Sequence, residues 1–297
     1  MYIPNGFSNL VEIVEEAFLK PPIVKSDDYM WSRFFWTALI SGDNAEAEVN
    51  YVYNLLDEYL LADIEFLNDK WIERSLMCLK DNQEKAEEPN LRGKIAAIHK
   101  IEVEIPNIYR TLTNANSVFE NMRMDSKYLQ NIAGKYEEEQ TLLAKIASKE
   151  EVSAIKSMHN SNHPNKIWGI AYTKAVLWLK GCGVAHGFIP NNKTSMKFLK
   201  QCDKSWTNDD FFVVNSRFNL ICKHLNADPY YAGLALWYYE TTKNLVSRKK
   251  SQFYSPEKLI RIMESNSMDI DDISTYLSDI ELLEELKEIL NLDSCYI

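Results

Sequence analysis

Glycine and proline are scarce in this chain of 297 residues, with nine of each. Both residues interrupt helices, and both fall below their usual share of roughly 7% and 5%. Between Gly42 and Gly169 there are only Gly93 and Gly134, whereas four of the nine glycines lie between positions 169 and 187. The sequence therefore predicts long helices with short connections, and a backbone-specific feature near residues 169–192.

The spacing of apolar side chains is helical almost throughout. Helices are predicted at 45–61, 172–180 and 208–225, and Asp228-Pro229 and Ser255-Pro256 each place a capping residue before a proline that opens a helix. Ser278 and Glu281 form a capping box at the start of a helix in the tail. One alternating stretch, IEVEI at 101–105, predicts a short strand that Pro106 ends, and polar loops are expected at 81–91 and 158–166. The predicted fold class is all-α.

Several classes of protein are excluded by simple features. No apolar run is long enough to span a bilayer, and the N-terminus lacks the basic and apolar regions of a signal peptide. The five cysteines are odd in number, widely spread and without a C-x-x-C pair, which argues against a disulfide scaffold, a zinc ribbon and an iron–sulfur cluster. We therefore expect a monomeric cytoplasmic protein that needs no cofactor and no metal and contacts no membrane.

Charge divides the chain into three parts. Residues 1–150 carry 16 basic and 26 acidic side chains, residues 151–250 carry 14 and 6, and residues 251–297 carry 3 and 11. The predicted domains follow this division: an N-terminal helical lobe at 1–150, a basic lobe at 151–250 and an acidic helical tail at 251–297. A basic region favours a polyanion such as DNA, because binding to phosphates releases condensed counterions. The alternative is a helical segment with a solvated lysine-rich face.

The segment 161–204 carries the most specific pattern. A polar loop leads to Trp168-Gly169-Ile170-Ala171, a helix follows at 172–180, and a glycine-rich break ends at Pro190-Asn191-Asn192, which opens a second, basic helix. A glycine turn before a helix N-terminus presents backbone N–H groups that can clasp a phosphate oxygen.

This pattern resembles the helix-hairpin-helix family of DNA glycosylases. The residues from Gly169 to Ala175 fall in the frame of the family's hairpin turn, and counting nineteen residues from Thr173 reaches Asn192, the family's catalytic aspartate position. The segment DPYYAGLALWYYE resembles a late helix of the alkylbase-removing branch. Ser41-Gly42-Asp43-Asn44 lies between two predicted helices that resemble the family's helix pair, whose short turn probes the stacked bases of DNA. The resemblance spans roughly residues 30–245 and implies a two-lobed fold with the site between the lobes.

The sequence departs from the family at the catalytic positions. Ala171 stands where the family has its second turn glycine, Asn192 where it has aspartate, and Thr173 where bifunctional members have a lysine. Lys174 is adjacent, but one residue along a helix is a rotation of about 100°, so we expect it to face elsewhere. These departures point away from lyase chemistry. They indicate a monofunctional enzyme with an unusual substrate, such as a modified base in foreign or phage DNA.

The resemblance implies the following site. The catalytic candidates are Asn192, Asp43 and Lys174, of which Asn192 orients water through its carbonyl oxygen. Asn215 is a rival for the catalytic position. We prefer Asn192, because Asn215 would require an insertion, relative to the family, between the Gly169–Ala175 turn and the catalytic residue. The DNA contacts are Gly169, Ile170, Ala171, Thr173, Lys193, Lys197, Lys200 and Asn44. The extruded base needs aromatic walls, for which the candidates are Trp31, Phe35, Trp168, Tyr172, Trp178, Trp237 and Tyr238.

Three functions remain open at this point. The first is a monofunctional DNA glycosylase that flips a base out of double-stranded DNA and leaves an abasic site. The second is a non-catalytic DNA-binding protein that kept the hairpin, and the third is an all-α protein-interaction module. Each aromatic candidate also has a plain alternative role in core packing.

Overall fold

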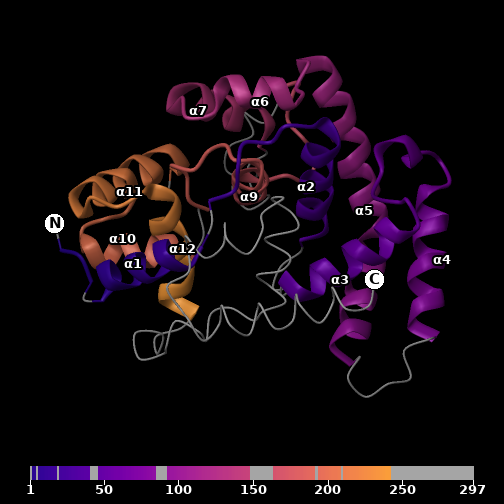
Figure 1. The fold of residues 1–297 in the computed structure, drawn as a ribbon, viewed down its shortest axis with the longest axis horizontal. Helices are drawn as coiled ribbons and strands as arrows, with labels where there is room; N and C mark the ends of the chain where they lie inside the picture. Colours follow the sequence, from indigo (N-terminus) through magenta and orange to yellow (C-terminus); the bar gives the residue numbers. More distant parts are fainter. Residues whose placement is uncertain are drawn as a thin grey trace, which may run out of the picture. The chain divides into compact units, whose positions relative to one another are not determined.

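The computed structural model describes residues 2–4, 6–18, 20–40, 46–84, 92–147, 163–190, 193–208 and 210–241. Within these ranges the chain is helical and contains no strand, which confirms the all-α prediction. It divides into two compact units, one made of residues 1–22 and 186–297 and the other of residues 23–185 (Figure 1). We call these unit 1 and unit 2.

Unit 2 is the continuous middle of the chain. Its elements are α2 (Asp27–Leu39), α3 (Glu46–Glu58), the short 3₁₀ helix η1 (Ile64–Phe66), α4 (Trp71–Glu84), α5 (Arg92–Met122), α6 (Ser126–Ile132), α7 (Tyr136–Ile146) and α9 (Tyr172–Gly181). An aromatic cluster joins three of them: the Trp178 ring of α9 lies 5.2 Å from Phe34 of α2 and 5.1 Å from Phe119 of α5. The Trp178 indole N–H donates to the carbonyl of Met30, so this large ring is buried with its polar atom satisfied.

Unit 1 joins the two ends of the described chain. It contains α1 (Phe7–Ala17), α10 (Lys193–Cys202), α11 (Phe211–Leu225) and α12 (Pro229–Thr241), and α1, α10 and α11 each pack against α12. Phe7 of α1 lies 4.5 Å from Phe198 of α10 between ring centroids. The Lys20 ammonium pairs with the Asp228 carboxylate at 2.7 Å, which ties the N-terminal segment to the start of α12.

The longest helix corrects one sequence prediction. Residues 101–105, predicted as a strand, lie inside α5, which continues through Pro106. Ile101 and Ile105 are fully buried, whereas Val103 between them is 76% exposed. An alternation over five residues also satisfies the i, i+4 spacing of a helix, and the buried set continues with Ile108 and Leu112 at that period. Pro106 lies on the exposed side of the helix.

Helix starts follow the capping signals. Asp228 accepts a hydrogen bond from the Tyr230 N–H at the start of α12, which confirms the predicted Asp-Pro start. Asp210 accepts from the first turn of α11 in the same way, and the predicted helices at 45–61, 172–180 and 208–225 are present as α3, α9 and α11. The predicted loop at 81–91 begins as the last turn of α4.

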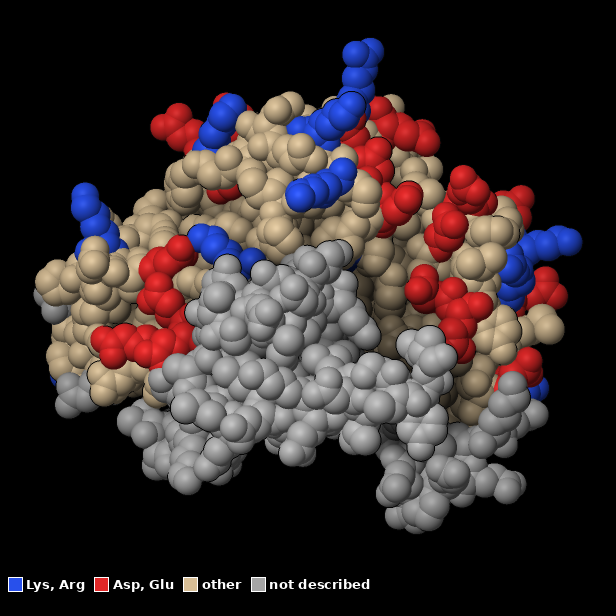
Figure 2. All heavy atoms as spheres, viewed as in Figure 1, with Lys and Arg blue, Asp and Glu red and all other residues tan. Residues whose placement is uncertain are grey.

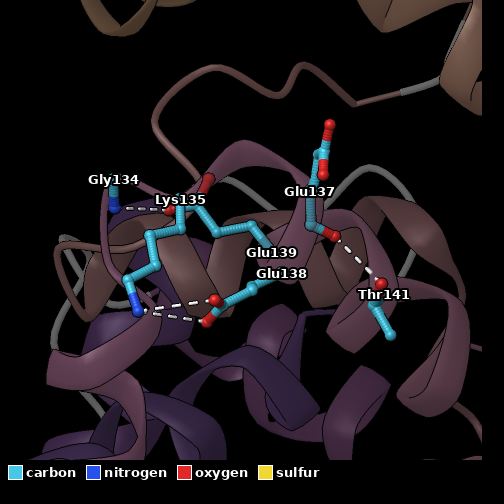
Figure 3. A network of polar contacts seen from close by, with 6 residues as sticks. All are labelled: Gly134, Lys135, Glu137, Glu138, Glu139 and Thr141. Atoms are coloured by element: carbon cyan, nitrogen blue, oxygen red, sulfur yellow. Dashed lines mark hydrogen bonds and ion pairs between the residues drawn. The ribbon is translucent and has the colours of Figure 1, made fainter.

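Two neighbouring glutamates in the α6–α7 region have different roles (Figure 3). Glu139 is buried, and its Oε1 accepts from the Gly134 N–H at 2.9 Å and from the Ala185 N–H at 3.1 Å. Glu138 is exposed and pairs with Lys135 at 3.4 Å. Glu139 therefore fastens the last residue of unit 2 to the turn before α7.

The two units differ from the lobes expected from charge. Among the described residues, the contacts place those of 1–22 with the C-terminal half and those of 163–185 with the middle of the chain. The physical reason is that charged residues lie mostly in solvent, whereas the buried apolar residues decide which segments pack together. The predicted turn at Ser41–Asn44, the Ser255-Pro256 start, the Ser278 capping box and the acidic tail at 251–297 lie outside the described residues.

Candidate nucleic-acid interface

The turn at Gly169 belongs to unit 2 and is fastened to α5. Gly169 has φ +74, a left-handed conformation that side chains disfavour, and a Cβ added to it would lie 2.5 Å from Thr111 Oγ1. The preceding Trp168 N–H donates to the Asn114 side-chain oxygen at 2.6 Å. Glycine is therefore required at this position for two reasons: the backbone angle is left-handed, and the backbone lies too close to α5 for a side chain.

The helix that follows the turn has an uncapped start. Ala171 is its extended N-cap residue and offers no side-chain acceptor. Ile170 is buried and its N–H donates to the Ile167 carbonyl at 3.2 Å, whereas Thr173 and Tyr172 are half-buried. The amides of Trp168 and Ile170 are thus already used inside unit 2, and no side chain caps the first turn of α9.

Residues 163–171 lead into the turn and are not helical, in agreement with the polar loop predicted before Trp168. The turn is held by the long helix α5 through Thr111 and Asn114.

Lys174 faces the interior of unit 2. Its ammonium donates to the carbonyl of Ala38, in the last turn of α2, at 3.2 Å. Burial lowers the pKa of Lys174 to about 8, while the nearby Glu104 carboxylate acts in the opposite direction. Lys174 thus donates to the Ala38 carbonyl, which has no hydrogen-bond partner within α2. The dipole of α2 also favours a cation at this C-terminal end of the helix.

The link between α9 and α10 is held by two asparagines of α11. Asn215 is fully buried, accepts from the Ile189 N–H at 2.7 Å and donates to the Phe211 carbonyl at 2.7 Å. Asn219, one turn later, donates to the Gly187 carbonyl at 2.9 Å. Both ends of the Asn215 amide are thus occupied by backbone groups, so this rival for the catalytic position has a structural role.

The basic face of α10 is solvent-exposed. Lys197 and Lys200 are exposed, while Phe198, Leu199 and Cys202 of the same helix are buried in the core of unit 1. Lys193 is the first residue of α10, and Asn192 stands directly before it in the sequence. Asn192, Asp43 and Asn44, together with the side chains of Lys193 and Trp237, lie outside the described residues.

Three aromatic candidates are core residues of unit 2. Trp31 is 5% exposed and donates its indole N–H to the Ala62 carbonyl, Phe35 is 1% exposed, and Trp178 is in the aromatic cluster described above. Periodicity places an aromatic side chain on a buried stripe but cannot tell a core wall from the wall of a pocket, which explains this difference from the predicted base pocket. Tyr238 is half-buried in unit 1 beside Phe18.

Trp168 behaves differently, because it is 37% exposed. The guanidinium of Arg110 lies 4.1 Å from the centre of its ring. Arg110, Thr111 and Asn114 share one face of α5, and together they hold the turn. Sequence reasoning missed these three residues because their contacts join α5 to residues more than fifty positions away, which no local pattern records.

The predicted site residues thus fall into two groups. Unit 2 brings together Trp168, Gly169, Ile170, Ala171, Tyr172, Thr173 and Lys174 at the start of α9, and unit 1 brings together Lys193, Lys197 and Lys200 on α10. On the face seen in Figure 2, acidic side chains gather over the side of unit 2 where α4 and α5 lie.

The described residues hold no group of three or more histidines, cysteines and carboxylates placed to bind a metal ion. Cys78, Cys182, Cys202 and Cys222 are free and buried, and burial raises the pKa of Cys182 to about 12. No helix in the described ranges combines the length and apolarity needed to cross a membrane.

The chain was compared with protein-family models, with curated proteins and with solved structures, and no match was found.

Proposed function

We propose that this chain is a monofunctional DNA glycosylase that flips a modified base out of duplex DNA and leaves an abasic site, with a modified base of foreign or phage DNA as the expected target. One observation carries the proposal. A left-handed Gly169 precedes the uncapped N-terminus of α9, and a non-helical link through Pro190 then leads to the basic helix α10 with Asn192 directly before it. This is the order in which the glycosylase family uses a phosphate-binding turn and a catalytic residue.

The chemistry assigns distinct tasks to the two regions. The positive end of the α9 helix dipole and the exposed Lys197 and Lys200 attract phosphates. Asn192 positions the water that attacks the sugar as the N-glycosidic bond breaks and positive charge develops on the ring. Asn192 carries no charge, so the DNA phosphates, and Asp43 if it lies near the sugar, supply the stabilising negative charge.

A second candidate is a non-catalytic DNA-binding protein. Asn192 stands where the family has a carboxylate. The missing negative charge favours DNA binding without catalysis.

Abasic-site formation on a panel of duplexes that carry modified bases separates the two candidates. Incubation with the full chain, followed by alkaline cleavage of the abasic strand, should release one labelled fragment from at least one duplex. DNA binding without cleavage on every duplex would leave the second candidate, and absence of salt-dependent DNA binding would exclude both.

Asn192 is the residue whose replacement tests the mechanism. Asn192→Ala should lower the rate of base release on the order of 10²-fold, because the water loses its positioning bond. Asparagine and serine are both favoured before the first residue of a helix, so Asn192→Ser is the matched control: serine keeps this preference but lacks the amide. Equal losses in Ala and Ser, with unchanged DNA binding, support the catalytic role.

Asn192→Asp restores the carboxylate of the family. If the site works by stabilising the charged sugar, the aspartate variant should keep or increase activity. Full activity in Asn192→Ala would contradict the role of Asn192 and direct attention to Asp43.

A further inference from the structure

We propose that Trp168 and Arg110 form a contact site for an unpaired nucleotide of DNA, with the base stacked on the Trp168 ring and its phosphate bound by Arg110. This inference rests on the proposed DNA partner and adds Arg110, a residue of α5, to the interface. It also assigns Trp168 to an exposed platform instead of the pocket for the excised base.

The first observation is the exposure of a rigidly held aromatic side chain. Trp168 is 37% exposed, whereas Trp31, Trp71 and Trp178 of the same unit are buried. Its backbone is fixed by the 2.6 Å hydrogen bond to Asn114 and by the contact of Gly169 with Thr111. An exposed ring on a fixed backbone loses little conformational entropy when it binds, which is what a stacking platform requires.

The second observation is the cation on the ring. The Arg110 guanidinium is exposed and lies 4.1 Å from the ring centre. None of the ion pairs formed among the described residues involves Arg110. A cationic ligand would bind above the Trp168 ring, but the Arg110 guanidinium already occupies that position. The site therefore favours an anionic ligand with a flat, apolar part.

A nucleotide matches both requirements, because it joins a planar base to a phosphate. The uncapped N-terminus of α9 begins three residues after Gly169, and its dipole adds positive potential on the same side of unit 2. Bases within a paired duplex are stacked on their neighbours, so only an unpaired or extruded base offers its face to Trp168.

Fluorescence anisotropy with the full chain tests this inference. The probes are a fluorescein-labelled duplex with one unpaired thymine and the same duplex fully paired, each titrated between 50 and 200 mM NaCl. Trp168→Ala should weaken binding to the unpaired-thymine duplex about tenfold or more, because base–aromatic stacking contributes roughly 1–3 kcal/mol. Trp168→Phe should recover most of the loss, and the paired duplex should change much less.

Arg110→Gln should lower the slope of log affinity against log salt by about one, the value for one lost phosphate contact. Val103→Ala is the matched control, because Val103 is exposed on the same helix but takes no part in the stack. Equal affinities of wild type and Trp168→Ala for the unpaired-thymine duplex would overturn the inference. A loss that is equal on both probes and accompanied by a lower melting temperature would also overturn it, since Trp168 would then be only structural.

The outcome is separable from that of the proposed activity. Binding of the unpaired thymine through Trp168 without base release would support this site and contradict the glycosylase. Base release at the wild-type rate by Trp168→Ala, with unchanged affinity, would contradict this site alone.

Discussion

The carboxylate of Glu139 holds two backbone segments of unit 2 together. It is buried and accepts hydrogen bonds from Gly134 and from Ala185, which is left-handed at φ 57. Glu139→Ala leaves both N–H groups without this acceptor, so it should lower the free energy of unfolding by about 2–4 kcal/mol. Glu139→Gln keeps one oxygen and should cost about half as much.

Glu138→Ala is the control for that change. Glu138 is exposed and pairs only loosely with Lys135, so its loss should cost less than about 1 kcal/mol. Urea unfolding of the three variants gives the comparison, and equal stabilities of the Glu138 and Glu139 variants would contradict the assigned role.

Lys174 should make the free energy of unfolding increase with pH. Burial lowers its folded-state pKa to about 8 from the ordinary 10.5, so between these values the unfolded chain binds more protons than the folded one. Stability should therefore rise with pH across this window, because the cost of burying the charge disappears as Lys174 loses its proton. The contribution is a few kcal/mol, at about 1.4 kcal/mol per pKa unit.

Lys174→Met removes this dependence. Denaturant unfolding of both proteins at pH 7, 8, 9 and 10 should show a stability curve that rises less steeply in the variant. Parallel curves would show that Lys174 is solvated and that its pKa is ordinary.

At the scale of elements, the Gly169 turn packs directly against helix α5. Gly169→Ala combines a left-handed backbone with a Cβ that meets Thr111 at 2.5 Å, whereas Gly134→Ala, at φ +77, meets nothing within 4 Å. Gly134→Ala should cost about 1–2 kcal/mol from backbone strain alone, and Gly169→Ala about 1–3 kcal/mol more because the contact adds to the strain.

Thr111→Ala combined with Gly169→Ala should recover part of that additional loss. Thermal melts of the two single variants and the double variant give the coupling between the two residues. Additive losses would mean that the turn does not press against α5.

The elements also show what the sequence could predict. Helices α9, α10, α11 and α12 were placed correctly, because each has a long apolar period and most have a capping or proline signal. Residues 101–105 were misread because five alternating residues satisfy both a strand and an i, i+4 helical face. The fastening of Gly169 by Thr111 and Asn114 could not be predicted, since it joins residues more than fifty positions apart and no local pattern records the contact.

At the scale of the molecule, the chain enters unit 2 after residue 22 and leaves it after residue 185. Unit 1 therefore joins an N-terminal helix to segments far along the sequence, and its core contains buried residues of α1, α10, α11 and α12. Local periodicity predicts each of these helices but not which of them share a core.

The exposed lysines of α10 test the proposed DNA interface in a chain whose net charge is −10. Lys193, Lys197 and Lys200 follow one another at helical spacings of four and three, and the last two are exposed. Replacing all three with glutamate should weaken duplex binding to a similar degree for every sequence. It should also lower the slope of log affinity against log salt by about 2–3, because three phosphate contacts are lost. Replacement of the exposed Lys70, Lys80 and Lys100 of unit 2 with glutamate changes the net charge equally and is the matched control. If both triple variants lose affinity equally, long-range charge explains the binding, and α10 is then not a contact surface.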